Sequence, residues 1–254
     1  MNGLKRRAAE PELMDDLSSG GAGLREALRH LRLLNRIFGA SGPTLYGVRR
    51  IWEEAGRPKR FTILDIGSGS GDVNRSLLQW ADRHRIGLTI TLSDITEEAC
   101  EEARLLYKRE PRIQVVRQDL FQLPEGCADI VTATQFVHHF PSEELPQVVQ
   151  QLLFASRMGI VIHDIHRHWL AWLAVWLVTR SISRNRYIRH DGPLSVAKGF
   201  RTAEWKTLSE SIVASNLSVI WRPLFRYVVT AHKSENVPSA IRHGDAGGKD
   251  RTNV

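Results

Sequence analysis

The sequence predicts an α/β fold: a doubly wound, Rossmann-like three-layer sandwich around a seven-stranded, mostly parallel sheet with an antiparallel last strand. Three observations predict it. Short apolar runs of strand length alternate with helical segments from residue 60 onward, as in parallel sheets with crossover helices. A glycine-rich turn follows the first apolar run, and acidic residues end the early strands. The 254 residues are enough for one such domain.

The segment before the sheet predicts two helices. Apolar residues recur with helical spacing over residues 24–38, and a second stripe of this kind ends before Pro58. We expect these helices, residues 24–58, to cover a cleft beside the sheet, or else only to pack on it. Residues 1–23 and 233–254 mix charged and small side chains, and we expect both to be flexible tails.

The sheet and its helices follow in alternation. We expect strands at residues 61–66, 87–93, 112–117, 128–133 and 159–163, and helices at residues 72–80, 96–108 and 142–156. A last helix, residues 202–214, precedes two strand-like runs. These runs, residues 217–222 and 224–232, meet at Pro223 and predict the antiparallel end of the sheet. The domain is therefore expected to cover residues 24–232.

The turn after the first strand carries alternating glycines between two acids, Asp65 and Asp72. Gly67, Gly69 and Gly71 allow positive φ angles and a close approach of a ligand to the main chain, and the next helix presents unpaired N–H groups there. The dinucleotide fingerprint G-x-G-x-x-G would need glycine at position 72. The acid found there would repel a pyrophosphate at a helix N-terminus. The turn therefore predicts a nucleoside-like cofactor without a pyrophosphate.

Acidic residues also mark the ends of the first three strands. In an open α/β sheet, ligands bind beyond the carboxyl ends of the strands, and Asp65, Asp94 and Asp119 stand at those ends. Asp94 lies about 20 residues beyond the glycine turn, where a carboxylate can accept hydrogen bonds from both ribose hydroxyls. Each acid taken alone is most often a helix N-cap. The three together, around a glycine turn, favour a nucleoside site.

These motifs resemble motif I and the acidic motifs of the class I S-adenosylmethionine-dependent methyltransferases, and the likeness covers residues 60–232. The resemblance implies S-adenosyl-L-methionine as the cofactor. It assigns the cofactor site to Asp65, Gly67, Ser68, Gly69, Gly71, Asp94, Ile95, Asp119, Leu120, Gln135 and His138. In this assignment Asp119 and Leu120 meet the adenine, whereas Gln135 and His138 line the methionine end.

Candidate catalytic residues follow the fourth and fifth strands. Methyl transfer from a sulfonium needs an aligned nucleophile and exclusion of water, and a phenol acceptor also benefits from a base. Asp164 is our first candidate for this base and His139 our second, while His190 lies in a segment that could close over the acceptor. An ordinary hydrogen-bonded side chain remains the alternative for each.

Residues 165–200 predict an insertion made of an apolar helix and a lid. The ten apolar residues Trp169–Val178 are too few for a bilayer span, which needs about 20. Three interpretations stay open: a helix packed on the sheet, a wall for an apolar or aromatic acceptor, and, with the arginines that follow, a segment at a membrane surface. Residues 185–200 predict a loop that acts as a lid, or a turn at Asp191 and Gly192.

The insertion resembles a subgroup of bacterial small-molecule methyltransferases associated with aromatic polyketide-type compounds of secondary metabolism. The expected function is S-adenosylmethionine-dependent methylation of a small aromatic or apolar acceptor, at a phenolic hydroxyl. Two alternatives stay open. One is C-methylation of a quinone or polyketide precursor, and the other is a non-catalytic protein of the same fold that binds a membrane or a partner. The acceptor and the oligomeric state are not determined by the sequence.

The formal charge of +7 could attract nucleic acid or an anionic membrane surface. Basic residues are spread over most helices without a zinc-finger spacing or an aromatic nucleic-acid motif, so we expect no specific nucleic-acid partner and leave weak membrane-surface contact open. Cys100 and Cys127 are too few for a disulfide framework or a metal site. We therefore expect no metal and a cytoplasmic location. The N-terminus lacks the apolar core of a secretory signal.

Overall fold

The computed structural model describes residues 4–16, 21–212 and 217–233. The strands are β1 (Arg60–Ile66), β2 (Gly87–Asp94), β3 (Ile113–Arg117), β4 (Ala128–Thr134), β5 (Ser156–Ile165), β6 (Ser218–Arg222) and β7 (Arg226–His232). The helices are α1 (Ala22–Ile37), α2 (Ser41–Glu54), α3 (Asn74–His84), α4 (Glu97–Leu106), α5 (Leu145–Ala155), α6 (Trp169–Ile182), α7 (Arg186–Lys198) and α8 (Thr202–Ser211). Short 3-10 helices are η2 (Leu13–Asp15), η3 (Leu120–Gln122) and η4 (Val137–His139). Most of the predicted C-terminal tail lies outside the described residues, as does the end of the predicted last helix.

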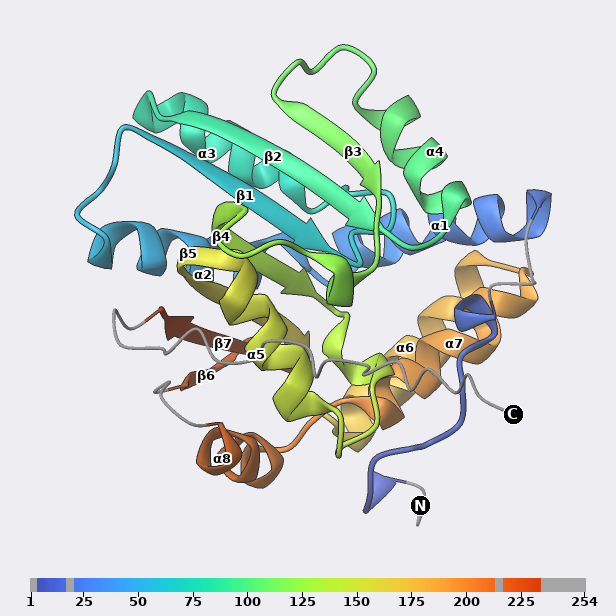
Figure 1. Cartoon of the computed structure of the whole chain (residues 1–254). Helices are drawn as coiled ribbons and strands as arrows, with labels where there is room; N and C mark the ends of the chain where they lie inside the picture. The colour runs from blue at the N-terminus through green and yellow to red at the C-terminus, as the bar shows by residue number, and fades with distance from the viewer. Residues whose placement is uncertain (1–3, 17–20, 213–216, 234–254) are drawn as a thin grey trace, which may run out of the picture.

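The seven strands form one sheet in the order β3-β2-β1-β4-β5-β7-β6, and helices flank it on both sides (Figure 1). Strands β1 to β5 are parallel, whereas β7 runs antiparallel to both β5 and β6. The predicted doubly wound, mostly parallel sheet with an antiparallel end is therefore confirmed. Strand β5 is longer than predicted and continues past His163 to Ile165.

Apolar side chains pack on each face of the sheet. One cluster joins β1 and β2 to α2, α3 and α4, with Trp80 at 2% exposure. The other joins β4, β5 and β7 to α5 and α8, with Trp205 fully buried. Because the central strands are covered on both faces, they appear in the sequence as continuous apolar runs. The remaining helices, α1, α6 and α7, lie beyond the carboxyl ends of the parallel strands (Figure 1).

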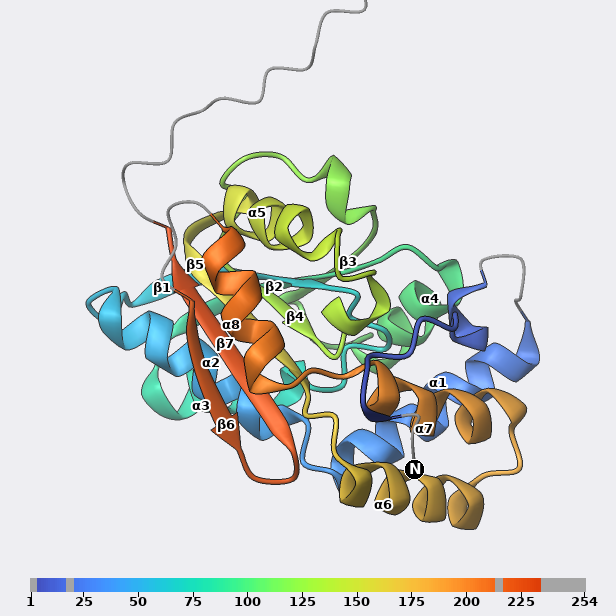
Figure 2. The same ribbon diagram turned by 90° about the horizontal axis from the view of Figure 1, so that it is seen from below.

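Residues 185–200 form helix α7 rather than the predicted loop. The side chain of Asn185 caps the helix by accepting a hydrogen bond from the amide of Tyr187 at 3.0 Å. Gly192 and Pro193, which predicted a turn, lie inside the helix. A Cβ at Gly192 would lie 2.8 Å from Thr179 Cγ2, so this glycine lets α7 pack closely against α6. The two helices lie side by side at one edge of the molecule (Figure 2).

The structure also differs from the expected N-terminal tail, because residues 4–16 are bound to the domain. Arg7 donates to the carbonyl oxygens of His138 at 3.0 Å and Lys198 at 2.9 Å. Two amides of η2 donate to the carboxylate of Asp191, each at 2.9 Å. These partners are more than 120 residues away in the sequence, so no local pattern could reveal them. We call residues 4–16 the N-terminal strap.

Two glycines of α2 test how closely this helix lies on the sheet. A Cβ at Gly47 would lie 2.4 Å from Val161 Cγ1, whereas one at Gly42 would meet nothing within 4 Å. We expect Gly47→Ala to lower the free energy of unfolding by about 1–3 kcal/mol through overpacking. Gly42→Ala, the matched control, should raise it by about 0.5–1 kcal/mol because alanine restricts the unfolded chain. Chemical denaturation measures both, and equal stabilities would contradict the close packing.

Candidate functional site

A cavity of about 480 Å³ opens beyond the carboxyl ends of the parallel strands, where ligands bind in open α/β sheets. The turn after β1, the ends of β2 and β4, and the short helices η3 and η4 line it from the side of the sheet. Helices α1 and α7 and the N-terminal strap line it from the other side. Ten of the eleven residues assigned to the cofactor from the sequence lie in this lining, and the exception is Gly71.

The glycine turn has the backbone geometry that its sequence predicts. The φ angles of Gly67, Gly69 and Gly71 are 59°, 55° and 71°, in the left-handed region that favours glycine. A Cβ at Gly67 would lie 2.1 Å from the ring of Phe136, and one at Gly71 would lie 2.4 Å from Leu92 Cδ1. Only Gly69 of the three has open space beside it. Gly71 therefore serves packing rather than the predicted contact with the cofactor.

Asp94 holds the turn in place. Its Oδ2 accepts a hydrogen bond from the amide of Gly69 at 2.9 Å, and its Oδ1 accepts from the amide and hydroxyl of Thr96 at 3.0 and 2.9 Å. The carboxylate thus joins the turn after β1 to Thr96, which is the N-cap residue of α4 in place of Asp94, and it also lines the cavity. A carboxylate oxygen offers two lone pairs, so these bonds leave acceptor capacity for a ligand.

The other two strand-end acids also have partners within the protein. Asp65 is 2% exposed and accepts hydrogen bonds from Asn74 Nδ2 at 2.6 Å and Thr132 Oγ1 at 2.7 Å. Burial raises the pKa of Asp65 to about 6, because the hydrogen bonds only partly offset the cost of an ionised buried carboxyl. Asp119 accepts from the amide of Phe121 at 2.9 Å and caps η3. Both line the cavity.

The cavity is acidic although the protein is basic. Seven carboxylates line it, and its lining includes no lysine or arginine among the described residues. They are Glu12, Asp15, Asp65, Asp72, Asp94, Asp119 and Asp191. Such a lining attracts a positively charged ligand and repels a pyrophosphate.

Helix α1 covers the cavity, whereas α2 does not. Leu24, Leu28, Leu31 and Leu34 of α1 line the cavity. The next residue, Asn35, donates to Asp72 at 3.3 Å and accepts from Gln135 Nε2 at 3.0 Å, so it bridges the glycine turn and the end of β4. Sequence reasoning missed Asn35, although it follows the apolar stripe directly. Helix α2 packs on β5 and β7 instead, so only the first of the two predicted covering helices covers the cleft.

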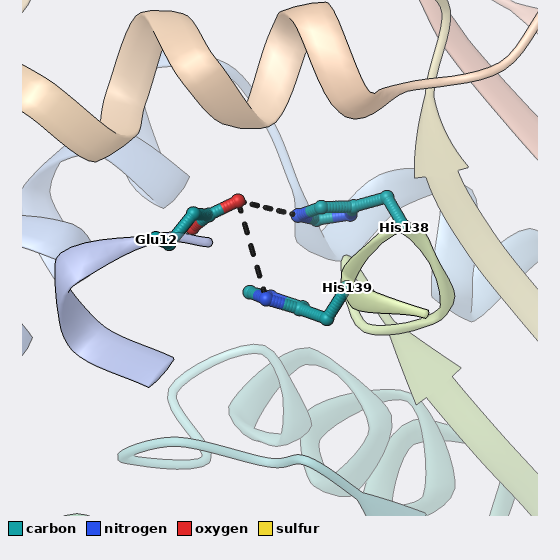
Figure 3. A group of neighbouring side chains, drawn as sticks. All are labelled: Glu12, His138 and His139. Atoms are coloured by element: carbon teal, nitrogen blue, oxygen red, sulfur yellow. Dashed lines mark ion pairs between the residues drawn. The ribbon is translucent and has the colours of Figure 1, made fainter. Parts of the chain in front are cut away.

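His138 lies in a buried group of charges at the strap side of the cavity (Figure 3). Its Nδ1 is 2.7 Å from Asp164 Oδ1, and its Nε2 is 3.5 Å from Glu12 Oε1. Burial alone would lower the pKa of His138, but the two carboxylates raise it to about 9. The neighbouring cationic groups hold the pKa of Glu12 below its usual value despite burial. Glu12 is a site residue that sequence reasoning missed, because it lies in the segment expected to be a tail.

Glu12, His138 and His139 also offer ligand atoms within 4.8 Å of one another, close enough to hold a metal ion. The protein places its own cation here, since Lys198 Nζ lies 3.7 Å from Glu12 Oε1 and 3.4 Å from Asp15 Oδ2. A divalent metal would have to displace this ammonium and the proton of His138. We therefore interpret these residues as a charge cluster that neutralises itself.

The structure places two of the three candidate catalytic residues away from the cavity. Asp164 is fully buried and outside the lining, so it contacts His138 rather than an acceptor, which corrects its predicted role as the base. His190 is half-exposed, bonds Asp191 at 2.8 Å and lies outside the lining, because the predicted lid is a helix. His139 does line the cavity, with its Nδ1 2.8 Å from Asp15 Oδ1.

Helix α6 matches neither its predicted place on the sheet nor its predicted place in the cavity wall. None of its residues lines the cavity, and it packs mainly on α7. Trp172 and Trp176 stack on each other at 6.4 Å, and Arg180 lies 4.2 Å over the ring of Trp176. Among the described residues, no helix is both long and apolar enough to cross a bilayer.

A family model for a methyltransferase domain matches residues 63–158. This stretch runs from β1 into β5 and contains the glycine turn with Asp94, Asp119 and His138. Residues 63–158 therefore carry a methyltransferase domain, in agreement with the motifs of the glycine turn and the strand-end acids. S-adenosyl-L-methionine is the cofactor of this methyltransferase, and its positive sulfonium suits the acidic cavity.

Solved structures share the fold. A putative S-adenosyl-L-methionine-dependent methyltransferase from Methanococcus maripaludis is 13% identical, with a TM-score of 0.58 over 86% of this chain and 97% of that one. An O-methyltransferase family 2 protein from Planctomyces limnophilus, solved with apigenin, is 13% identical. Its TM-score is 0.57, over 85% of this chain and 63% of that one. The citrinin polyketide synthase CMeT domain is 15% identical, with a TM-score of 0.52 over 69% of this chain and 47% of that structure, about half its length. No curated protein sequence matches the chain.

The role of Asp94 can be tested by cofactor affinity. We expect Asp94→Ala to weaken S-adenosylmethionine binding by about 1–3 kcal/mol, the scale for losing a charged hydrogen-bond acceptor, as measured by calorimetry. Asp82→Ala is the control, because Asp82 is an exposed carboxylate that pairs with Arg112 outside the cavity. Unchanged affinity in the Asp94 variant would contradict its assignment to the ribose.

Proposed function

We propose that this methyltransferase acts on a small aromatic or apolar acceptor at a phenolic oxygen, with His138 as the base. S-adenosylmethionine supplies an electrophilic methyl group on a positively charged sulfur. The observation that carries the proposal is the placement of His138, which lines the same cavity as the cofactor residues while a buried carboxylate binds its Nδ1. A histidine held in this way has one tautomer, and its Nε2, which faces Glu12 Oε1 at 3.5 Å, is the nitrogen that would take a proton.

The residues proposed for the cofactor divide by their position along the strand ends. Asp94 and Ile95, after β2, are assigned to the ribose, and Asp119 and Leu120, after β3, to the adenine. Asp65 is assigned to the methionine end, with Gln135. Support comes from the raised pKa of Asp65, since a nearby ammonium group would favour its ionised form and relieve part of the cost of its burial.

The acceptor would lie between α1, α7 and η4. Leu28 and Leu31 of α1, Ile188 of α7 and the rings of Phe136 and Phe140 line this part of the cavity. The two rings lie edge to face at 5.2 Å. Such surfaces suit a flat apolar ligand, since they can cover it without leaving polar groups unpaired. These side chains support an aromatic acceptor, and we propose that the acceptor is a compound of the polyketide type.

The proton of the acceptor hydroxyl would pass to Nε2 of neutral His138. Asp164 accepts from Nδ1 and so fixes the tautomer in which Nε2 carries the free lone pair. When Nε2 takes the proton, the imidazolium lies between the two carboxylates of Asp164 and Glu12, which stabilise its charge. Because the pKa of His138 is about 9, the neutral form grows as the pH rises toward that value.

C-methylation of a quinone or polyketide precursor is the second candidate, because the same base could take a ring proton. The likeness to a polyketide synthase CMeT domain favours it as a candidate, while the likeness to an O-methyltransferase favours the first. Product analysis with isotopically labelled S-adenosylmethionine would separate them, since methyl on oxygen and methyl on carbon give different fragments and chemical shifts.

Glu12 should set the pH dependence of the reaction. The rate constant kcat/KM should rise with pH up to about 9, the pKa of His138 in the free enzyme. In Glu12→Gln the rise of kcat/KM should occur at a pH lower by about one unit, which corresponds to about 1.4 kcal/mol. The shift follows because a carboxylate that favours the imidazolium is lost. Asp15→Asn is the control, because Asp15 pairs with His139. An unchanged pH dependence of kcat/KM in Glu12→Gln would contradict the role of Glu12.

Asp164 should affect kcat through His138, without contacting the cofactor or the acceptor. In Asp164→Asn the amide would donate to Nδ1 of His138 and so place the proton of the neutral ring on Nε2. We expect kcat to fall by about 10²–10⁴-fold, the range for general-base catalysis. Calorimetric affinity for S-adenosylmethionine should change little. A variant as active as the parent at every pH would remove His138 as the base.

A further inference from the structure

The outward face of helix α6 is apolar and exposed. Trp169, Leu170, Leu173 and Leu177 are 46%, 43%, 39% and 50% exposed. They recur at helical spacing, so they form one stripe along the helix. We call these four residues the α6 surface. The opposite side of the helix, with Ala171 and Thr179, is buried, so α6 packs against the protein on one side and exposes apolar side chains on the other.

The α6 surface continues onto the turn between β6 and β7. His168, which caps α6, stacks on Phe225 of this turn at 4.9 Å. Leu224, beside it, is 55% exposed. Figure 2 shows the hairpin turn and α6 at the same end of the molecule. A contiguous exposed apolar face of this kind marks a binding surface rather than an ordinary solvent face.

The positive charge beside the α6 surface indicates the kind of partner it would bind. Residues 165–190 contain no aspartate or glutamate. Arg180, Arg184, Arg186 and Arg189 lie at or beyond the C-terminal end of the apolar stripe, and among the described residues none of them pairs with a carboxylate. Elsewhere on the protein many arginines do, as Arg112 does with two acids. The unpaired positive charge beside the apolar face therefore fits an anionic surface.

We propose that the α6 surface docks this protein on the anionic face of a lipid bilayer, with α6 lying in the plane of the membrane. Tryptophan and leucine side chains would enter the interfacial layer, and the arginines would meet lipid phosphates. The helix has 14 residues, too short for the about 20 that span a bilayer. A second copy of the chain fits less well, because a twofold interface would place the same arginines of two copies near one another.

Docking would place the cavity close to the membrane. Helix α7 lies between them, since Gly192 of α7 packs against Val175 and Thr179 of α6 and also lines the cavity. An apolar acceptor dissolved in the bilayer would then start one helix layer from the site. The docking itself does not depend on the proposed phenol chemistry, so the two proposals can fail separately.

Flotation of the full chain with vesicles tests the proposal. Vesicles of phosphatidylcholine with about one-third phosphatidylserine should carry the protein upward, and those of phosphatidylcholine alone should carry at least about tenfold less. Added salt at about 0.5 M should weaken the binding to the anionic vesicles. Absence of the protein from the anionic vesicles, or equal binding to both kinds, would contradict the proposal.

Two variants localise the binding. Leu173→Gln with Leu177→Gln should lower the partition onto anionic vesicles by about tenfold or more, because two apolar side chains no longer enter the interface. Leu105→Gln is the matched control, since Leu105 is 66% exposed on α4 and away from the α6 surface, and it should bind as the parent does. Light scattering without lipid supplies the competing outcome. A parent dimer that the double variant converts to a monomer would assign this face to a second copy and overturn the proposal.

Discussion

The hydrogen bond from the amide of Gly69 to Asp94 is the contact on which the site depends. It joins the turn after β1 to the end of β2, and neighbouring packing leaves the turn little freedom. Gly67 lies against Phe136 and Gly71 against Leu92, both too closely for a Cβ. Fixed in this way, the turn presents its backbone to the cavity in one conformation, which lowers the ordering cost of binding a ligand.

Charge separates the inside of the site from the outside of the protein. The formal charge of the chain is +7, yet carboxylates line the cavity. Burial makes the ionised form of these carboxylates unfavourable, as the raised pKa of Asp65 shows. At the acceptor end cationic groups stabilise the carboxylate of Glu12, since His138 and Lys198 lie beside it. Beside the turn, no lysine or arginine of the described residues lines the cavity, and a sulfonium cofactor would complement its acids.

The sequence predicted what depends on local patterns and missed what depends on distant contacts. The strands, the glycine turn and the acids of the first three strands could be read directly, because each is set by neighbours in the chain. Helix α7 was missed because Gly192 and Pro193 indicate a turn unless the packing against α6 is known. Glu12 was missed because its partners are far away in the sequence. Asp164 was placed at the correct strand end, but a strand end does not tell which side of the sheet a side chain faces.

The strap has a consequence for how this enzyme could diverge from its relatives. The family model covers residues 63–158, which contain nearly all of the donor side of the cavity. The opposite wall comes from elements outside that range: the strap, α1 and α7. Substitutions there can therefore reshape the acceptor pocket while the methyl-donor machinery stays intact. Two proteins with the same core domain can in this way differ in the wall that faces the acceptor, because that wall lies outside the residues they share.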